Sequence, residues 1–165
     1  MTDNPPSTDI VIRAFVDTDS VPVWGLHNRA LEGTGAHAGN GAWDQDVRDP
    51  HKFYSNCNGV FLVGERAGRI SAMGAYIPKG DGVVEIKRMR VDPAYQGRGL
   101  GGRILEALER RAKAAGFTLA VVETLERQKT AQRLYERSGY INIGVSTMGD
   151  FEIIHYEKDL ADISR

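Results

Sequence analysis

The sequence predicts a single α/β domain in which a mixed sheet carries helices on both faces. Segments with strand character come first as hairpins, and the later part alternates strand, helix, strand, helix and strand. This order is typical of a sheet that is covered by helices. The length of 165 residues suits one domain, over residues 10–165, after a flexible polar tail over residues 1–9 that holds two prolines.

Composition excludes several classes of protein. The 21 basic and 22 acidic residues give a net charge of −1, which argues against a generally basic nucleic-acid-binding protein. The single cysteine, Cys57, can form neither an internal disulfide nor a cysteine-rich metal site. The first residues lack a basic region followed by an apolar one, and no apolar run approaches the roughly 18 residues of a membrane span. We therefore expect a cytoplasmic protein with no membrane or nucleic-acid partner.

The first half of the chain predicts short elements. A strand is expected over residues 10–15, and a helix over residues 17–31 with Asp17 or Asp19 as its cap. Four glycines within residues 33–41 predict a mobile loop. Further expected elements are a helix over 44–54 that is interrupted near Pro50, a hairpin of strands 59–65 and 69–77, and a turn over 78–82.

The second half alternates strands and helices. Strands are predicted over residues 83–91, 118–122, 140–145 and 151–158. The clearest helix runs from Leu100 to Ala115, with Gly116 where a helix should stop, and a shorter helix spans residues 130–138. One apolar stripe runs along the longer helix, formed by Leu100, Ile104, Leu105, Leu108, Ala112 and Ala115.

The turn before the Leu100 helix is rich in glycine. Gly97, Gly99, Gly101 and Gly102 let the backbone approach a ligand, and the helix N-terminus directs free N–H groups and a positive dipole end at it. Residues 85–113 hold eight basic and four acidic residues, which also favours an anion. The pattern predicts a phosphate or diphosphate site; the alternative is a tight turn whose glycines serve helix packing.

A dinucleotide-binding loop is a competing interpretation. Gly97, Gly99 and Gly102 match G-x-G-x-x-G, and Glu123 follows at the end of a strand. In that fold, however, the glycines follow the first strand at once, whereas five residues separate Val91 from Gly97 here. The charged strand before the loop and the short chain after Glu123 also argue against it.

The strand over residues 83–91 changes its inward phase. Val84 and Ile86 share one face, while Met89 and Val91 fall in the opposite phase. A β-bulge near Lys87 and Arg88 would return both pairs to the core and separate the strand from its neighbour. The alternative is a strand with one solvent face and a tolerated misfit.

The segment from about Val83 to Gly144 resembles the GNAT-type acetyl-CoA-dependent N-acetyltransferases. Residues 96–101 (QGRGLG) fit the Q/R-x-x-G-x-G/A loop of that family, and residues 131–140 (AQRLYERSGY) resemble its A-x-x-L-Y-E-x-x-G-F/Y segment. The resemblance implies a mostly antiparallel central sheet with one splayed parallel strand pair, here strands 83–91 and 118–122. It also implies that the pantetheine arm of acetyl-CoA lies between those strands and that no metal is needed.

The resemblance and the chemistry together suggest two catalytic residues. A lysine-like amine is neutral in only roughly 1 in 2,500 molecules at pH 7, so acyl transfer needs a base, and Glu85 stands where many family members carry one. Glu123 is the second choice, and either carboxylate could instead serve only in an ion pair or a loop. By motif position, Tyr135 donates a proton to the departing thiolate; otherwise it is a core aromatic residue.

The resemblance also predicts cofactor contacts. The Met89 N–H is the candidate oxyanion donor, Arg98 and Arg103 could add charge near the phosphates, and Lys129 and Arg133 could meet the 3′-phosphate. Gln128 stands where the family often has asparagine. The expected cofactor-binding residues are Met89, Arg90, Val91, Gln96, Gly97, Arg98, Gly99, Leu100, Gly101, Gly102, Glu123, Gln128, Ala131, Leu134 and Tyr135.

The acceptor is less clearly indicated. The resemblance places its site at the N-terminal helices and a late hairpin, and Trp24, His27, Trp43 and Tyr76 are candidates for it, or for the core. His27, His37, His51 and His155 lack metal-ligand spacing. A small-molecule amine acetylated in a ternary complex is the leading interpretation, with a homodimer expected by family analogy. Alternatives are a non-catalytic acyl-CoA sensor, an enzyme that acetylates proteins or peptides, and a dinucleotide enzyme.

Overall fold

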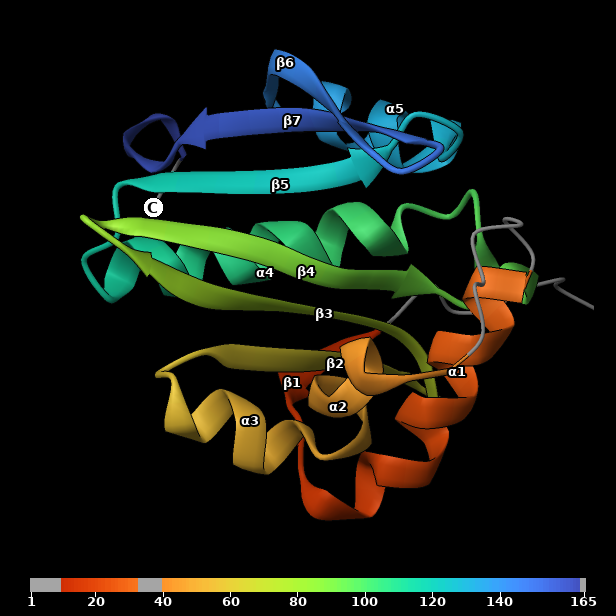
Figure 1. The fold of residues 1–165 in the computed structure, drawn as a ribbon. Helices are drawn as coiled ribbons and strands as arrows, with labels where there is room; N and C mark the ends of the chain where they lie inside the picture. Colours follow the sequence, from red (N-terminus) through yellow and green to blue (C-terminus); the bar gives the residue numbers. More distant parts are fainter. Residues whose placement is uncertain (1–9, 33–39, 164–165) are drawn as a thin grey trace, which may run out of the picture.

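A computed structural model describes residues 10–32 and 40–163, which form a twisted seven-stranded sheet between helices (Figure 1). The predicted tail over residues 1–9 and most of the predicted loop over 33–41 lie outside the described residues. The strands are β1 (Val11–Ala14), β2 (Val60–Arg66), β3 (Arg69–Gly80), β4 (Val83–Val91), β5 (Leu119–Leu125), β6 (Ile141–Met148) and β7 (Phe151–Asp159). The helices are α1 (Ser20–Glu32), α2 (Gln45–Arg48), α3 (Pro50–Asn56), α4 (Leu100–Ala114) and α5 (Lys129–Arg137). Short 3₁₀ turns lie at Asp17–Asp19, Ala42–Asp44, Pro93–Tyr95 and Leu160–Asp162.

The sheet is mixed and mostly antiparallel, as expected. Its strand order is β1-β2-β3-β4-β5-β7-β6, and among the described strands only β4 and β5 pair in parallel. The glycine loop follows the fourth strand, and hairpins precede it. This topology excludes the doubly wound parallel sheet of a dinucleotide-binding domain, which begins with the strand that carries the glycines.

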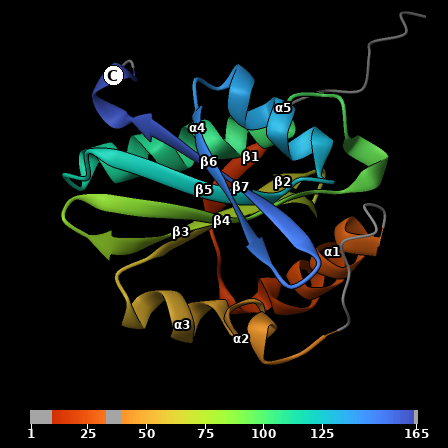
Figure 2. The same ribbon diagram turned by 45° about the horizontal axis from the view of Figure 1, so that its top comes forward.

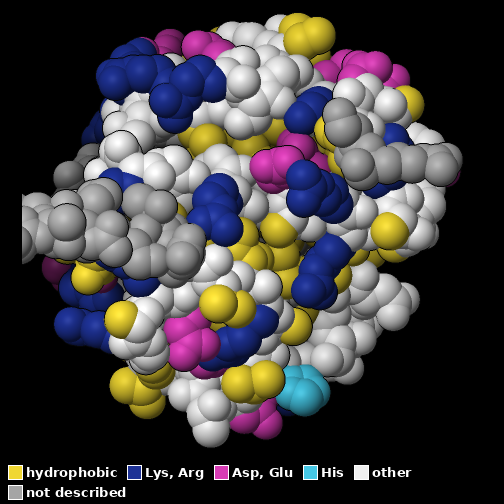
Figure 3. Space-filling model, turned by 180° about the vertical axis from the view of Figure 1, so that it is seen from behind, with side chains coloured by type: hydrophobic (Ala, Val, Ile, Leu, Met, Phe, Trp, Pro, Cys, Tyr) yellow, Lys and Arg dark blue, Asp and Glu magenta, His cyan; other side chains and the backbone are white. Residues whose placement is uncertain are grey.

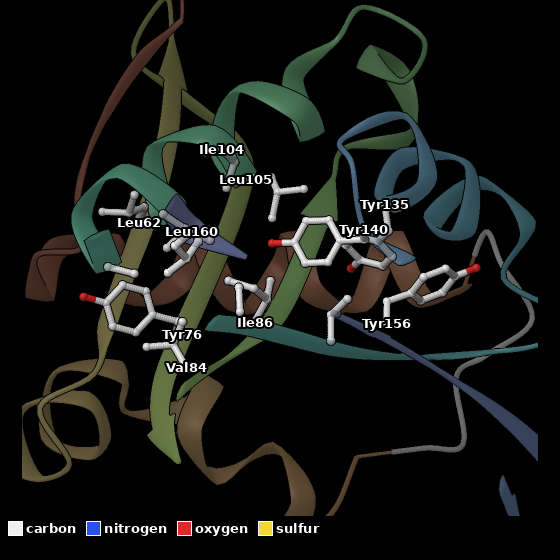
Figure 4. Packing of buried hydrophobic residues seen from close by; sticks show 14 of the residues in the cluster. Leu62, Tyr76, Val84, Ile86, Ile104, Leu105, Tyr135, Tyr140, Tyr156 and Leu160 are labelled. Atoms are coloured by element: carbon white, nitrogen blue, oxygen red, sulfur yellow. The ribbon is translucent and has the colours of Figure 1, made fainter. Parts of the chain in front are cut away.

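Helices cover both faces of the sheet (Figure 2). On one face, α4 and α5 pack on a core that includes Ile86 of β4, Leu105 of α4 and Tyr156 of β7 (Figure 4). On the other face, α1, α2 and α3 cover a second core that includes Leu26 and Met73. The stripe predicted for α4 is confirmed up to Ala112, because Leu100, Ile104, Leu105, Leu108 and Ala112 are all buried.

Most predicted boundaries hold, with four differences. The interruption near Pro50 is confirmed, since α2 ends at Arg48 and the Asp49 carboxylate accepts the Lys52 N–H at 3.2 Å to start α3. The turn predicted over 78–82 is shorter, because β3 continues to Gly80 and the chain reverses at Asp81 and Gly82, both with positive φ.

The other three differences concern α1, β5 and β6. Strand β6 continues to Met148, beyond the predicted end at 145, because its pairing with β7 extends to Met148 opposite Phe151. The carboxylate predicted to cap α1 turns backward, because Asp19 accepts the Val16 N–H at 2.9 Å and pairs with Arg13 at 2.7 Å. Strand β5 extends to Leu125, beyond the predicted end at 122, because β7 remains paired with it over that length.

Candidate functional site

The glycine loop holds a conformation that only glycine adopts easily. Gly97 and Gly99 have φ values of 78° and 77°, a region that L side chains rarely enter. A Cβ at either position would meet nothing within 4 Å, so backbone conformation and not space requires glycine there. Gly101 is different, because its Cβ would lie 3.2 Å from Leu134 of α5. The absence of a side chain at Gly101 therefore lets α5 pack against the start of α4.

The N-terminus of α4 faces this loop with its backbone donors available. Gly99 occupies the N-cap position and no side chain caps the helix. The first N–H groups of an α-helix have no partner within the helix, and the dipole adds positive potential there. The predicted anion site is therefore present as backbone geometry.

A β-bulge interrupts β4, as the phase change predicted. Met73 of β3 pairs with Arg90 and Ala75 pairs with Lys87, so that Arg88 and Met89 together stand opposite Gly74. Arg88 takes a φ of 59°, which costs a non-glycine residue about 1–2 kcal/mol. A Cβ on Gly74 would lie 2.5 Å from Met89 Sδ, so the glycine makes room for the bulged residue.

The parallel pair β4 and β5 separates immediately before the bulge. The strands are paired only from Val83 with Leu119 to Ile86 with Val122, although both continue further. Beyond Ile86 the edge of β4 that faces β5 has no strand partner. A cavity of about 680 Å³ opens there, between the glycine loop, β4, β5, α5 and the end of α1.

The cavity gathers nearly all of the predicted cofactor-binding residues. Met89, Arg90, Val91, Gln96, Gly97, Gly99, Leu100, Gly101, Gly102, Glu123, Gln128, Ala131, Leu134 and Tyr135 line it, as does Glu85. Arg98 is not among the lining residues, because its guanidinium lies over the Tyr95 ring, 5.4 Å from the centroid. Of the other basic candidates, Lys129 lines the cavity, whereas Arg103 and Arg133 do not.

Positive charge predominates in this cavity. Its lining includes six basic side chains, Lys87, Arg88, Arg90, Arg127, Lys129 and Arg137, against the two carboxylates of Glu85 and Glu123. Viewed from the α4 side, Lys and Arg side chains surround hydrophobic side chains at the centre of the surface (Figure 3). Such a lining favours an anionic ligand with an apolar portion.

Tyr135 lies at the inner end of the cavity, on α5. Its ring is buried and packs against Tyr140 and Tyr156 at centroid distances of 5.7 and 5.9 Å (Figure 4). Burial raises the pKa of Tyr135 to about 12, and the nearby Arg90 charge opposes that rise. At neutral pH the hydroxyl is therefore protonated. It lines the cavity and forms no hydrogen bond with the described residues, so it remains available as a donor.

The two carboxylates of the site differ in exposure. The Glu85 side chain is 20% exposed and its Oε2 lies 3.2 Å from Lys79 Nζ, the ion pair that was the alternative to a catalytic role. The Glu123 side chain is 56% exposed and lies 3.4 Å from His155 Nδ1. Glu85 is thus the more enclosed carboxylate next to the separated strands.

Gln128 fixes the turn between β5 and α5. Its Oε1 accepts the Leu125 N–H at 3.2 Å and the Thr124 hydroxyl at 3.0 Å. Its amide oxygen is therefore occupied within the protein, which limits the cofactor contact inferred from motif position.

The four predicted acceptor residues do not line the described cavity. His27 is fully buried, and its Nε2 lies 2.8 Å from Asp44 Oδ1. Tyr76 is paired with Ile86 and therefore points into the α4 core, against Phe117. Trp24 packs beneath Arg48, and Trp43 is exposed at the surface.

On the α1 side, the cavity is lined by residues that the sequence did not single out for ligand contact. Ala30 and Leu31 of α1 line the cavity, and so does Arg88. Arg88 donates from Nε and Nη2 to both carboxylate oxygens of Asp46, at 2.9 and 2.7 Å. The phase change that predicted the bulge could also have identified Arg88, because a residue in a β-bulge leaves the regular alternation and its side chain points in a new direction.

Over residues 10–32 and 40–163, no group of three or more His, Cys, Asp or Glu residues is placed to hold a metal ion. No helix in the same ranges has the length and apolar character needed to cross a membrane.

Comparisons with known proteins agree with this geometry. Residues 24–140 match the model of the acetyltransferase (GNAT) family. The chain is 39% identical over 85 residues to an IAA acetyltransferase of Azospirillum brasilense, covering 51% of this chain and 56% of that one. It is 27% identical over 104 residues to N-acetyltransferase family 8 member 2 of Rattus norvegicus, covering 60% and 46%. The chain therefore spans about half the length of these curated relatives.

Solved structures show the same fold. A GNAT-family acetyltransferase of Staphylococcus aureus superposes with a TM-score of 0.82 at 16% identity, over 92% of this chain and 99% of that one. The yncA protein of Salmonella typhimurium, solved with its cofactor acetyl-CoA, gives 0.77 at 21% identity over 96% and 98%. Since the family model covers well over half of the sequence, the chain belongs to the GNAT family of acetyltransferases.

Proposed function

We propose that the protein transfers the acetyl group of acetyl-CoA to a primary amine of a small molecule, directly and within a ternary complex. The observation that carries the proposal is the continuity of one cavity from the glycine loop, through the gap between β4 and β5, to Tyr135 and Glu85. An anion site, a slot for an extended arm, a proton donor and a carboxylate base then lie along one path.

The cofactor is held largely by backbone. The N–H groups at the start of α4 bind the diphosphate, with Gly97 and Gly99 shaping the loop. The edge of β4 from Lys87 to Val91 has no strand partner on the β5 side, so its backbone groups are free to hydrogen-bond the amides of the pantetheine arm. The positive potential that predominates in the cavity favours the approach of the negatively charged phosphates.

Two side chains carry the proton transfers. Glu85 accepts a proton from the ammonium group of the acceptor, directly or through water, so that the neutral amine attacks the thioester carbonyl. Tyr135 donates its phenolic proton to the departing thiolate sulfur, and the second proton that the amine nitrogen loses as the amide forms restores the phenol, directly or through water. Met89 has no pairing partner in either neighbouring strand, and its N–H is the proposed donor to the oxyanion of the tetrahedral intermediate.

The acceptor enters from the α1 side of the sheet. Ala30 and Leu31 border the cavity there, next to Arg88 and Arg90. A small amine is proposed because the cavity of about 680 Å³ must take the acceptor together with part of the cofactor.

Two alternatives make different predictions. An acyl-CoA sensor would bind acetyl-CoA without needing Glu85 or Tyr135, and a protein acetyltransferase would prefer peptides over small amines. In a thermal-shift screen with acetyl-CoA, CoA, NAD and ATP, we expect only acetyl-CoA and CoA to raise the melting temperature. The rate of CoA thiol release is then measured with small amines and with peptides. We expect small amines to raise this rate above that of acetyl-CoA alone. Binding without any thiol release would favour the sensor.

We also propose that the protein is a cytoplasmic homodimer. Support for a dimer comes from β6, the edge strand of the sheet, which is exposed along its whole length. It carries four large apolar side chains in contact with solvent, those of Ile141, Ile143, Val145 and Met148. An apolar edge strand is a ready site for pairing with a second chain.

A further inference from the structure

Arg88 and Arg90 of β4 both lie on the sheet face covered by α1, α2 and α3. Residues paired directly across antiparallel strands share a face, and Arg90 pairs with Met73, which belongs to the core beneath α1. Arg88 reaches Asp46 of α2 on the same side. This is the face opposite α4, whose N-terminus forms the diphosphate site.

The two arginines differ in their partners. Arg88 is satisfied by a two-point pair with Asp46. Arg90 donates from Nη1 to the Met89 carbonyl at 2.9 Å, but its buried Nε has no hydrogen-bond partner, and no carboxylate pairs with it in the described structure. Asp46 and Asp44, the two carboxylates whose charge acts on Arg90, are already engaged, Asp46 by Arg88 and Asp44 by His27.

An unpaired guanidinium in this position is costly. Burial, and then repulsion from Arg88, lowers the pKa of Arg90 to about 10. A charged group that loses its hydration without gaining a partner lowers the stability of the fold by several kcal/mol. A counter-charge next to the Arg90 guanidinium would offset this cost. Because Arg90 lines the cavity, a ligand can supply that counter-charge.

We propose that Arg90 binds a carboxylate on the acceptor, so that the preferred substrates are small amines that also carry a carboxylate group. The inference rests on the proposed acetyl transfer and names its substrate class. The Arg90 Nη2 group donates to no described residue and Nη1 keeps one further proton, so the outer end of the guanidinium can bind a carboxylate through two hydrogen bonds. Binding on the α1 face places this contact on the proposed acceptor side of the separated strands, with Glu85 on the same strand and Tyr135 lining the same cavity.

A phosphate of acetyl-CoA is the other anion that could use this charge. The two sources separate experimentally, because a cofactor contact would change the affinity for CoA, whereas an acceptor contact would change selectivity among amines. The loop that holds the diphosphate lies at the N-terminus of α4, on the far side of the sheet from Arg90, and this placement favours the acceptor.

The test compares acceptors in matched pairs, α-amino acids and their carboxamides, on the wild type, Arg90→Gln and Arg110→Gln. Arg110 is an exposed arginine of α4 outside the cavity and controls for loss of one positive charge. We expect the wild type and Arg110→Gln to prefer the carboxylate member of each pair by at least about tenfold in kcat/KM, and Arg90→Gln to bring that ratio to about one. A wild type without preference, or an Arg90→Gln variant that keeps it, overturns the proposal.

Binding measurements separate this proposal from the proposed function. Calorimetry of CoA, and then of an N-acetylated amino acid and its carboxamide in the presence of CoA, is done on the same three proteins. A weaker CoA Kd in Arg90→Gln with selectivity retained would assign the charge to the cofactor and reject the inference. Carboxylate-selective binding that needs Arg90, without thiol release from any amine, would reject acetyl transfer while supporting the carboxylate site.

Discussion

Tyr135 combines a buried ring with a hydroxyl that has no hydrogen bond to the described residues. Removing that oxygen in Tyr135→Phe therefore leaves no buried partner unsatisfied, and we expect the free energy of unfolding to change by less than about 1 kcal/mol. If the hydroxyl protonates the thiolate, kcat should fall about 10²-fold while the Kd for acetyl-CoA changes little. Steady-state kinetics and calorimetry measure both, and an unchanged kcat would reject the assignment.

The pKa of Tyr135 adds a pH signature. A value of about 12 keeps the hydroxyl protonated across the ordinary assay range, so the wild-type kcat should not decline with rising pH between about pH 7 and 9 through loss of this proton. A decline that is present in the wild type and absent in Tyr135→Phe would place the pKa of this group far lower than burial indicates.

Glu85 is tested through the ionisation of the acceptor. In Glu85→Gln we expect kcat/KM to fall about 10²-fold at pH 7, because most of the amine is then protonated and no base removes the proton. As pH rises toward the amine pKa, the neutral fraction grows about tenfold per unit, so the gap to the wild type should narrow. Lys79→Gln, which removes only the ion-pair partner, should cost less. A gap that is constant with pH would show that Glu85 acts otherwise.

At the scale of elements, the role of the glycine loop can be tested by comparing alanine substitutions at the two ends of α4. Gly99 and Gly116 flank the two ends of α4, have φ values of 77° and 94°, and have open space around their Cβ positions. Alanine at either position should cost about 1–2 kcal/mol of stability through the same backbone penalty. Only Gly99→Ala should also weaken acetyl-CoA binding, by tenfold or more, since Gly99 lines the cavity and Gly116 does not. Equal effects on binding would argue against the loop as the diphosphate site.

The ion pair between Asp46 of α2 and Arg88 of the β4 bulge is predicted to stabilise the fold. Asp46 is buried, and although burial alone would raise the pKa of its carboxyl, the hydrogen bonds and charge of Arg88 lower it below its usual value. A folded pKa below the unfolded one means stability that is present above the unfolded value and lost as pH falls through the folded value. Asp46→Asn should remove this stabilisation at pH 7. We expect urea unfolding to show a free energy of unfolding lower by about 3–5 kcal/mol, because Arg88 would stay buried without a counter-charge.

A surface pair provides the comparison for that variant. Glu106→Gln breaks the exposed pair with Arg110 on α4 and should change stability by no more than about 0.5 kcal/mol. If Asp46→Asn were equally mild, the Arg88 pair would not hold α2 to the bulge.

The elements also show what the sequence could reveal. The bulge was predictable because the phase change between Ile86 and Met89 is local, and the α4 start was predictable because its glycines are adjacent. The acceptor side was not. Tyr76 turns into the α4 core because of its register with Ile86, and His27 is buried by a bond to Asp44, seventeen residues away. Register and long-range pairing are set by the assembled fold, so the sequence could not show that these residues lie outside the lining of the cavity.

At the scale of the whole molecule, the sheet is protected unevenly. Its central strands are covered on both faces, whereas β6 forms one edge and is exposed from Ile141 to Met148. Edge strands that remain monomeric usually carry charge or proline, and β6 has neither along its eight residues. Light scattering after size exclusion should therefore give about twice the mass of one chain.

Substitution on β6 then decides whether this strand forms the interface. Ile143→Arg combined with Val145→Arg places two like charges on the edge, which disfavours close pairing of identical strands, and should convert the dimer to a monomer. Val21→Arg on α1 removes another strongly exposed apolar side chain away from β6 and should leave the dimer intact. The cavity is built from residues of one chain, so the monomeric variant should still bind acetyl-CoA. A dimer that survives both arginines on β6 would place the interface elsewhere.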